Sequence, residues 1–168
     1  MLLEDFAPVS EAVANFAASC ARKLRAQSSF AVSMMVFIHT PNFSTNRPRY
    51  YKNVIVQLPM PTSDSIEIVR HALLGLKKIF IPGYQYLKAG VIITEIVNSQ
   101  NIQLNMFDNL DRDKRDKLMQ AIDKINAKNN HVVNLAMQGK DERWKLRQDY
   151  LSKHYTTDIN DILVINCK

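Results

Sequence analysis

The sequence has few cysteines, few glycines and no long apolar run, and each scarcity excludes a class of protein. Its 168 residues include only Cys20 and Cys167, whereas small secreted domains held by disulfides carry more cysteines. Its four glycines form no glycine-rich loop of the kind that cradles phosphates. The sequence contains no stretch of about 18 apolar residues, which is the length needed to span a membrane. Its first residues also lack the pattern of a signal peptide. We therefore expect a cytoplasmic protein with reduced thiols.

Patterns that would indicate catalysis or metal binding are also missing. The four histidines never approach one another, or a cysteine, at metal-ligand spacing (His39, His71, His131 and His154). A polymerase active site needs two or three clustered carboxylates for magnesium, but Glu95 stands alone in its predicted strand. We assign the pair Asp141-Glu142 to a solvated loop. No nucleophile motif is present. The sequence thus predicts no enzyme activity, no metal and no cofactor for this chain.

What the sequence does contain is enough apolar residues for a core and an excess of positive charge. Hydrophobic residues make up 46% of the chain, and the formal net charge is +6. Positive charge favours polyanionic partners through counterion release. Many basic proteins nevertheless bind no nucleic acid, so a protein–protein adaptor without any DNA contact is the alternative.

Helical periodicity predicts three amphipathic helices. The first spans Ser10–Ala26, with apolar residues at offsets typical of one helix face. The second begins at Asp64, which is followed three residues later by a glutamate as in a capping box, and it ends before Pro82-Gly83. The third runs from Asp111 to Asn129-Asn130 and is densely charged. We interpret its charges mainly as a solvated face.

Between and around these helices the sequence predicts four strands. Phe30–Ile38 has a wholly apolar phase that begins at Phe30, and Tyr50–Leu58 and Gly90–Val97 are rich in strand-forming residues. Leu2–Phe6 is a short fourth candidate. The order predicts an α+β fold of the split βαβ type, with an antiparallel four-stranded sheet and two helices on one face. The other face is then open and is the natural place for function.

The chain is divided into two patterned parts by a polar, poorly periodic stretch. We predict a first domain over residues 1–100, a connector over 101–110 and a small mixed α/β module over 111–168. In the last part Val132–Met137 is a candidate short strand. Beyond Gly139 the pattern fits helix and irregular structure equally well.

The connector contains the segment Gln103-Leu104-Asn105-Met106-Phe107. It resembles the short peptide with which bacterial polymerases bind the ring-shaped sliding clamp. In such a peptide Gln103 would hydrogen-bond at the edge of a pocket, and Leu104, Met106 and Phe107 would bury apolar surface. The alternative is that these three side chains pack onto a neighbouring part of the chain.

A longer resemblance runs from Gln103 to Val164. It is carried by Leu118-Met119, Ile125-Asn126-Ala127-Lys128, Gln138-Gly139, Trp144-Lys145-Leu146-Arg147, Leu151-Ser152 and Tyr155-Thr156-Thr157. These segments are similar to the small domain at the end of UmuC-like subunits of DNA polymerase V. Lys153 and His154 depart from the family, which usually has proline and arginine there.

Residues 1–100 resemble the little finger of Y-family polymerases. The resemblance is carried by Tyr50-Tyr51, Pro61-Thr62-Ser63-Asp64-Ser65 and Tyr86-Leu87-Lys88-Ala89-Gly90-Val91. Together the resemblances imply the C-terminal part of an error-prone translesion polymerase of the SOS DNA-damage response. In that family the catalytic carboxylates and magnesium belong to the palm, which this chain lacks.

The resemblance also implies partners. The little finger would bind primer–template duplex through phosphates, for which the expected contacts are Arg47, Arg49, Lys52 and Lys88. Arg25 is interpreted as a helix-end charge that could also reach DNA. The last module would dock a UmuD-like partner or a recombinase filament, with Trp144 and Tyr155 as anchors. These aromatic residues could equally form the core of a small module.

Overall fold

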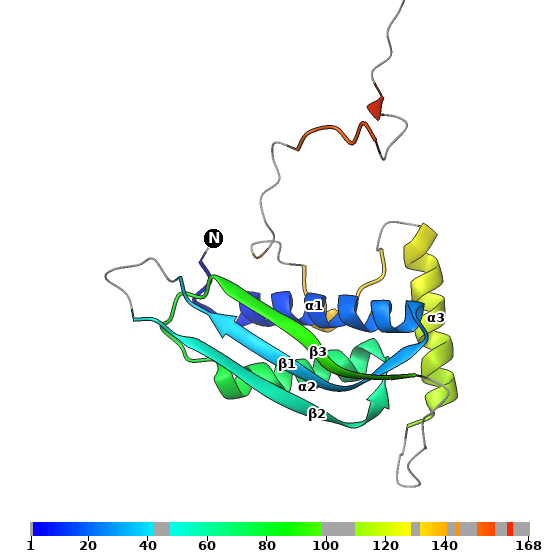
Figure 1. The fold of residues 1–168 in the computed structure, drawn as a ribbon, viewed down its shortest axis with the longest axis horizontal. Helices are drawn as coiled ribbons and strands as arrows, with labels where there is room; N and C mark the ends of the chain where they lie inside the picture. Colours follow the sequence, from blue (N-terminus) through cyan, green and yellow to red (C-terminus); the bar gives the residue numbers. More distant parts are fainter. Residues whose placement is uncertain are drawn as a thin grey trace, which may run out of the picture.

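A computed structural model describes residues 2–41, 48–98, 110–128, 132–140, 144, 151–156 and 161–162. Within these residues the fold is α+β, as expected (Figure 1). The elements in chain order are α1 (Phe6–Ala26), β1 (Ser29–His39), β2 (Tyr51–Thr62), α2 (Ser65–Ile79), β3 (Lys88–Asn98), α3 (Arg112–Lys128) and the 3-10 turn η2 (Ala136–Gln138).

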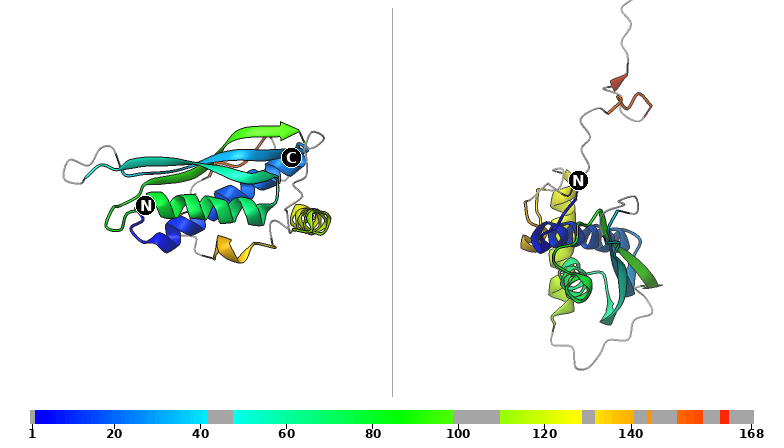
Figure 2. Two further views of the ribbon diagram at one scale, coloured as in Figure 1. Left: turned by 90° about the horizontal axis from the view of Figure 1, so that it is seen from below. Right: turned by 90° about the vertical axis from the view of Figure 1, so that its left-hand side faces the viewer.

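The sheet is antiparallel with the strand order β2-β1-β3. Helices α1 and α2 cover one face of the sheet, and the opposite face is left open (Figure 2). On the central strand Met34, Val36 and Ile38 are fully buried beneath the helices. Because alternate residues of a strand point to opposite faces, the residues between and after them line the open face.

An irregularity in β1 changes which residues face the core. The pairing register shifts around Ser33 on both sides of the strand. Ala31 and Ser33 are buried, and Met34 next to them is buried as well. The predicted apolar phase that began at Phe30 is therefore correct only from Met34 onward, because the alternation is broken at this irregularity.

The predicted fourth strand is not confirmed, since the described residues form a three-stranded sheet. Leu3 makes only an isolated antiparallel bridge with Tyr86, and helix α1 already begins at Phe6. The helix begins earlier than Ser10 because Pro8 lies in the first turn, where its missing N–H costs no intrahelical hydrogen bond. This early start leaves too few residues for a strand.

The short strand predicted over Val132–Met137 is wrong. The backbone N–H and carbonyl of Val133 are bound by the side chain of Asn126, at 2.9 and 2.8 Å. The N–H of Leu135 is bound by the side chain of Gln138, which lies in η2. Side chains thus satisfy the backbone groups that a strand would offer to a neighbour.

Helix α2 packs closely on the sheet at Gly75. A Cβ atom at this position would lie 2.7 Å from Cγ2 of Val56 and 3.3 Å from Cγ2 of Val36. The absence of a side chain therefore sets the distance between α2 and the covered face of the sheet.

Replacing Gly75 by valine should lower the free energy of unfolding by about 0.5–2 kcal/mol. Overpacking typically costs about 1–3 kcal/mol, which exceeds the gain in helix propensity of under about 1 kcal/mol. Urea denaturation would measure the change. The control is Leu74→Ala, at a helix position whose side chain is 46% exposed. Equal stability of Gly75→Val and the native chain would show that α2 does not pack this closely.

Candidate nucleic-acid interface

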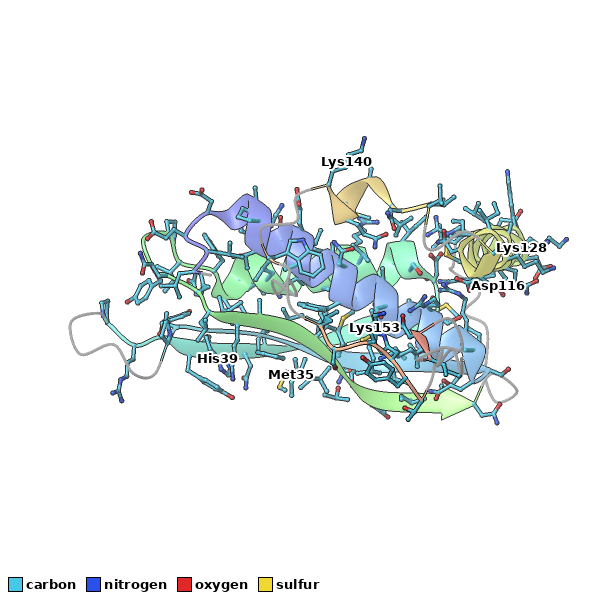
Figure 3. All side chains as sticks on the ribbon, turned by 90° about the horizontal axis from the view of Figure 1, so that it is seen from above. Met35, His39, Asp116, Lys128, Lys140 and Lys153 are labelled. Carbon is cyan, nitrogen blue, oxygen red and sulfur yellow. The ribbon has the colours of Figure 1, made fainter. Side chains whose placement is uncertain are left out.

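The open face of the sheet presents side chains in rows that cross all three strands. One row is Tyr51–His39–Lys88, the next is Asn53–Phe37–Gly90, and the third is Ile55–Met35–Ile92. We call these nine residues the open-sheet face. Figure 3 shows Met35 and His39 on the side of the sheet opposite the helices.

Aromatic rings form a continuous strip at one end of the open-sheet face. The ring centroids of His39 and Tyr51 are 3.9 Å apart, and those of Phe37 and His39 are 5.1 Å apart. The Phe37 ring covers Gly90, where a Cβ atom would lie only 2.6 Å from Cζ of Phe37. Glycine at position 90 thus lets the end of this ring approach the backbone of the neighbouring strand.

His39 lies between this strip and a lysine. Burial and then the nearby charge of Lys88 lower the pKa of His39 from its usual value of 6.5. The ring is therefore neutral at pH 7. Its Nε2 atom is buried and has no hydrogen-bond partner within the described part of the chain. An anion bound beside Lys88 would raise the pKa of His39 and favour its charged form.

The third row of the open-sheet face is apolar and exposed. The side chains of Ile55 and Ile92, which flank Met35, are 62% and 47% exposed. Beyond this row Ser33 hydrogen-bonds Thr94, and the exposed Glu95 brings negative charge. Positive charge is therefore concentrated at the Lys88 end of the face.

The structure separates the cations that were expected to contact phosphates. Arg49 is exposed two residues before β2 begins, and Lys88 is exposed on the open-sheet face. Lys52 is exposed too, but it pairs with the core residue Ile38, so its side chain leaves the sheet toward the helices. Arg47 lies outside the described residues.

Sequence reasoning did not identify the aromatic strip as part of the site. The signal was present in β1, where Met35, Phe37 and His39 recur at every second position in the phase opposite the core. A strand with apolar residues in both phases indicates either burial on both faces or a binding surface.

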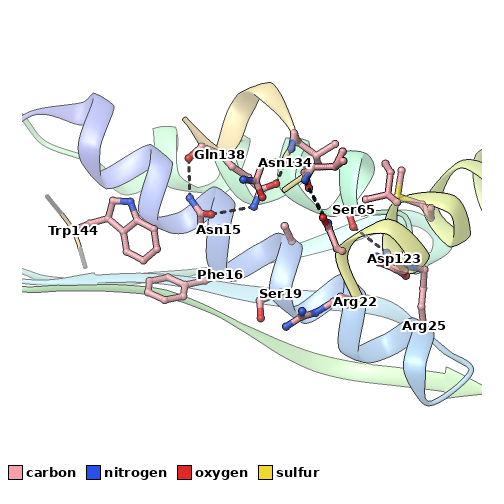
Figure 4. Close-up of a pocket in the computed structure, with 16 residues that line it drawn as sticks. Asn15, Phe16, Ser19, Arg22, Arg25, Ser65, Asp123, Asn134, Gln138 and Trp144 are labelled. Carbon is pink, nitrogen blue, oxygen red and sulfur yellow. Dashed lines mark hydrogen bonds and ion pairs between the residues drawn. The ribbon is translucent and has the colours of Figure 1, made fainter. Parts of the chain in front are cut away.

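The other predicted site residues have different outcomes. The segment Gln103, Leu104, Met106 and Phe107 lies outside the described residues. Trp144 is half-buried, with its ring edge-on to Phe16 of α1 at a centroid distance of 5.6 Å (Figure 4). Tyr155 is 48% exposed. Its role as a partner anchor stays a prediction, whereas Trp144 packs within the chain.

A second charged region lies where α3 meets the ends of α1 and α2. Arg25 of α1 binds both carboxylate oxygens of Asp123 in α3, at 2.6 and 2.8 Å. Arg25 also donates to the carbonyl of Ser63 and the hydroxyl of Ser65. Its guanidinium therefore holds α3 in place, and the idea that it reaches DNA is not supported.

Two more arginines link α3 to the start of α2 through salt bridges. Arg115 binds the buried carboxylate of Asp64 at 2.5 Å, and Arg112 binds Glu67 at 2.6 Å. Asp64 is also the N-cap of α2, accepting a hydrogen bond from the N–H of Ile66. The charge run of α3 is therefore not only a solvated face, since one side of it is paired with the rest of the fold.

The segment after α3 closes a cleft of about 670 Å³ against α1. The side chain of Asn15 in α1 donates to the backbone carbonyl of Gln138 and accepts from the side-chain amide of Gln138, as Figure 4 shows. Polar groups and the rings of Phe16 and Trp144 line the cleft. Part of the region that resembled the small C-terminal domain thus lies directly on α1.

Two negative findings concern only the described residues. There, no three His, Cys, Asp or Glu side chains are close enough to share a metal ion. None of the helices described is both long and apolar enough to cross a bilayer.

Comparison with known proteins gives two family matches. Residues 2–106 match the impB/mucB/samB family C-terminal domain, and residues 116–165 match a domain of unknown function (DUF4113). Similar proteins are UmuC of Salmonella typhimurium, 35% identical, and ImpB of Salmonella typhimurium, 31% identical. Each alignment covers 95% of this chain and 38% of the relative.

MucB of Escherichia coli is 30% identical over 99% of this chain and 39% of its own length. The chain thus spans about two fifths of the length of these relatives. The resemblance to UmuC-like proteins that the sequence predicted is confirmed across nearly the whole chain.

Proposed function

Because the chain belongs to the impB/mucB/samB family of C-terminal domains, we propose that it is the non-catalytic C-terminal part of an error-prone translesion DNA polymerase of the UmuC type. Its role in SOS DNA repair would be to hold the enzyme on primer–template duplex. Residues 1–100 bind the duplex, residues 101–110 carry the clamp peptide, and residues 111–168 form the third functional unit. The observation that carries this proposal is the uncovered open-sheet face with cations at one end.

The chemistry of the open-sheet face suits DNA binding without sequence readout. Lys88 and Arg49 can neutralise phosphates, and phosphate contacts position a protein without reading bases. The third row, of Ile55, Met35 and Ile92, has no N–H or O–H donor and no oxygen or nitrogen acceptor for base edges. A lesion-bypass enzyme must accept any template, so a face with this composition fits the role.

Two further contacts are part of the proposal. Gln103, Leu104, Met106 and Phe107 bind the sliding clamp as a short peptide, on the strength of the sequence pattern alone. Residues 111–168 bind a UmuD-like partner or a recombinase filament, with Tyr155 as an exposed anchor. Magnesium would be needed only by a catalytic domain outside this chain.

A second function is supported by one specific observation. The exposed isoleucines Ile55 and Ile92 lie side by side with Met35, and such an apolar row can be covered by another protein. In that case the chain is an adaptor that makes no DNA contact.

Replacing Arg47, Arg49, Lys52 and Lys88 by alanine should weaken duplex binding for all sequences alike. Each phosphate contact removed should flatten the slope of log affinity against log salt by about one. Fluorescence titrations with duplex at several salt concentrations would measure both quantities. The matched control removes four exposed cations from the helices (Lys23, Arg70, Lys77 and Lys78).

Single variants make the test sharper. Lys88→Ala should flatten the salt slope more than Lys52→Ala, because only Lys88 projects from the open-sheet face. An identical slope in the open-face and helix variants would show that the duplex binds elsewhere. If the native chain binds no duplex even at low salt, the adaptor function is favoured instead.

A further inference from the structure

Helix α3 has one side that contacts α1 and the start of α2 and another side that faces away from them. On the held side Met119 is buried, Arg115 pairs with Asp64, and Asp123 pairs with Arg25. These positions recur at intervals of four residues, so they lie along one face of the helix.

The opposite side of α3 exposes apolar residues at helical spacing. Leu118 and Ile125 are 46% and 43% exposed, and Ala121 between them is exposed too. Intervals of three and four residues bring the three side chains into one stripe. In an amphipathic surface helix, leucine and isoleucine are expected on the buried side.

Four exposed lysines flank this apolar stripe (Lys114, Lys117, Lys124 and Lys128). Each lies three or four residues from Leu118, Ala121 or Ile125, and therefore beside it on the helix surface. Figure 3 shows Lys128 pointing away from the body of the molecule. None of the four has an ion-pair partner among the residues that the structure describes.

The charges of α3 are thus sorted by side. Asp123 and Arg115 pair with the rest of the fold, whereas the four lysines form no ion pair among the described residues, although Asp113 lies one helical turn before Lys117. Asp116 lies toward the end of α1, in a hollow lined also by Arg25 and, at the edge of the outward side, by Lys124. A solvated charged face accounts for the lysines, but it does not account for the exposed Leu118 and Ile125 beside them.

We propose that the outer stripe of α3 (Lys114, Lys117, Leu118, Ala121, Lys124, Ile125 and Lys128) is a docking site for an acidic amphipathic segment of a partner protein. Apolar anchors of that segment would cover Leu118 and Ile125, and its carboxylates would pair with the flanking lysines. Repulsion between lysines opposes a second copy of this chain as the partner. This assignment rests on the proposed function and deepens it, because it names a surface and a ligand chemistry within residues 111–168.

Nucleic acid is the less suitable occupant. Phosphates would pair with the lysines but would leave the apolar centre exposed to water. The outer stripe also lies on a helix packed at the ends of α1 and α2, away from the open-sheet face (Figure 2). A partner protein and a duplex could therefore be bound at the same time.

The test measures binding of the whole chain to a labelled helical peptide. The peptide is rich in glutamate, and its leucines are spaced alternately three and four residues apart so that they lie on one face. The native chain should bind this peptide, and the same composition with leucines scattered around the helix should bind much more weakly. Replacing the four lysines by alanine should weaken binding at least about tenfold, because several exposed ion pairs each contribute a small amount. Replacing Leu118 and Ile125 by serine should weaken it as well.

Matched variants serve as controls. Exchanging the four lysines for arginine should preserve binding, and replacing Lys23, Arg70, Lys77 and Lys78 by alanine should leave it unchanged. Equal binding of both peptides would overturn the proposal. The proposal would also be overturned if duplex DNA competed with the peptide for the native chain but not for the four-lysine variant. It would likewise be overturned if the native chain sedimented as a dimer and the four-lysine variant as a monomer. These outcomes would indicate nucleic acid or a second copy as the occupant.

Discussion

A chain in which Leu104 and Phe107 are both replaced by alanine should no longer bind the sliding clamp detectably. Each anchor that is lost removes roughly 1.5–3 kcal/mol of apolar burial. A short peptide has little binding energy beyond its anchors, because it must also be ordered when it binds. Together the two changes correspond to a loss of affinity of roughly two orders of magnitude or more.

Titration of the cognate clamp with native and variant chains would measure this loss. The matched control is Leu74→Ala with Leu87→Ala, which removes two leucines that are 46% and 47% exposed in the fold. Duplex affinity should stay unchanged in the Leu104/Phe107 variant, since neither side chain is charged. Retained clamp binding together with lower stability in urea would show instead that both side chains belong to the core.

The helices could be predicted from sequence because their signals are local. The apolar periodicity of α1 and α2 and the stop at Pro82-Gly83 depend on residues within a few turns. The capping role of Asp64 was also visible, and it is confirmed by its bond to the N–H of Ile66. What the local pattern could not give is the second partner of Asp64, since Arg115 lies 51 residues further along the chain.

The errors in the sheet have non-local causes. The irregularity around Ser33 lies where β1 pairs with β2 and β3 at once. The alternation of residues along β1 alone cannot predict how the strand pairs with two neighbours. Residues 132–137 look like a strand because they are apolar and short, but side chains of Asn126 and Gln138 take the backbone hydrogen bonds.

The residues of the candidate site were predicted from their charge. Which face of the sheet each one occupies depends instead on the pairing register of the strands. Counting cations placed Lys52 and Lys88 in one group, but their partners in β1 are Ile38 and His39, which point to opposite faces. The aromatic strip depends on the same register, because Phe37 reaches across to Gly90 on another strand. Such contacts cannot be derived from spacing within one segment.

Arg25→Ala should lower the free energy of unfolding by about 2–4 kcal/mol. The Arg25 side chain is only 12% exposed and donates to Asp123, Ser63 and Ser65. Removing it leaves the carboxylate of Asp123 and the carbonyl of Ser63 without these donors, and unpaired groups of this kind are costly. Asp123 is partly exposed, so the cost falls below that of a fully buried pair.

Urea unfolding should be followed with two signals, circular dichroism for the whole chain and fluorescence of Trp144, which is the single tryptophan. Because Trp144 contacts Phe16, its fluorescence reports whether the region after α3 stays on α1. In Arg25→Ala the fluorescence transition should move to lower urea than the dichroism transition, since α3 has lost its bond to α1. The matched control is Lys23→Ala, at an exposed position two residues earlier.

A double-mutant cycle with Asp123→Asn isolates the Arg25–Asp123 pair. The coupling should lie in the range of about 0.5–3 kcal/mol that is typical of residues in contact. Arg25→Lys should be intermediate, because lysine keeps the charge but cannot bind both carboxylate oxygens in parallel. If Arg25→Ala is as stable as Lys23→Ala, then α3 is held in place by its other contacts, such as the Arg115–Asp64 pair.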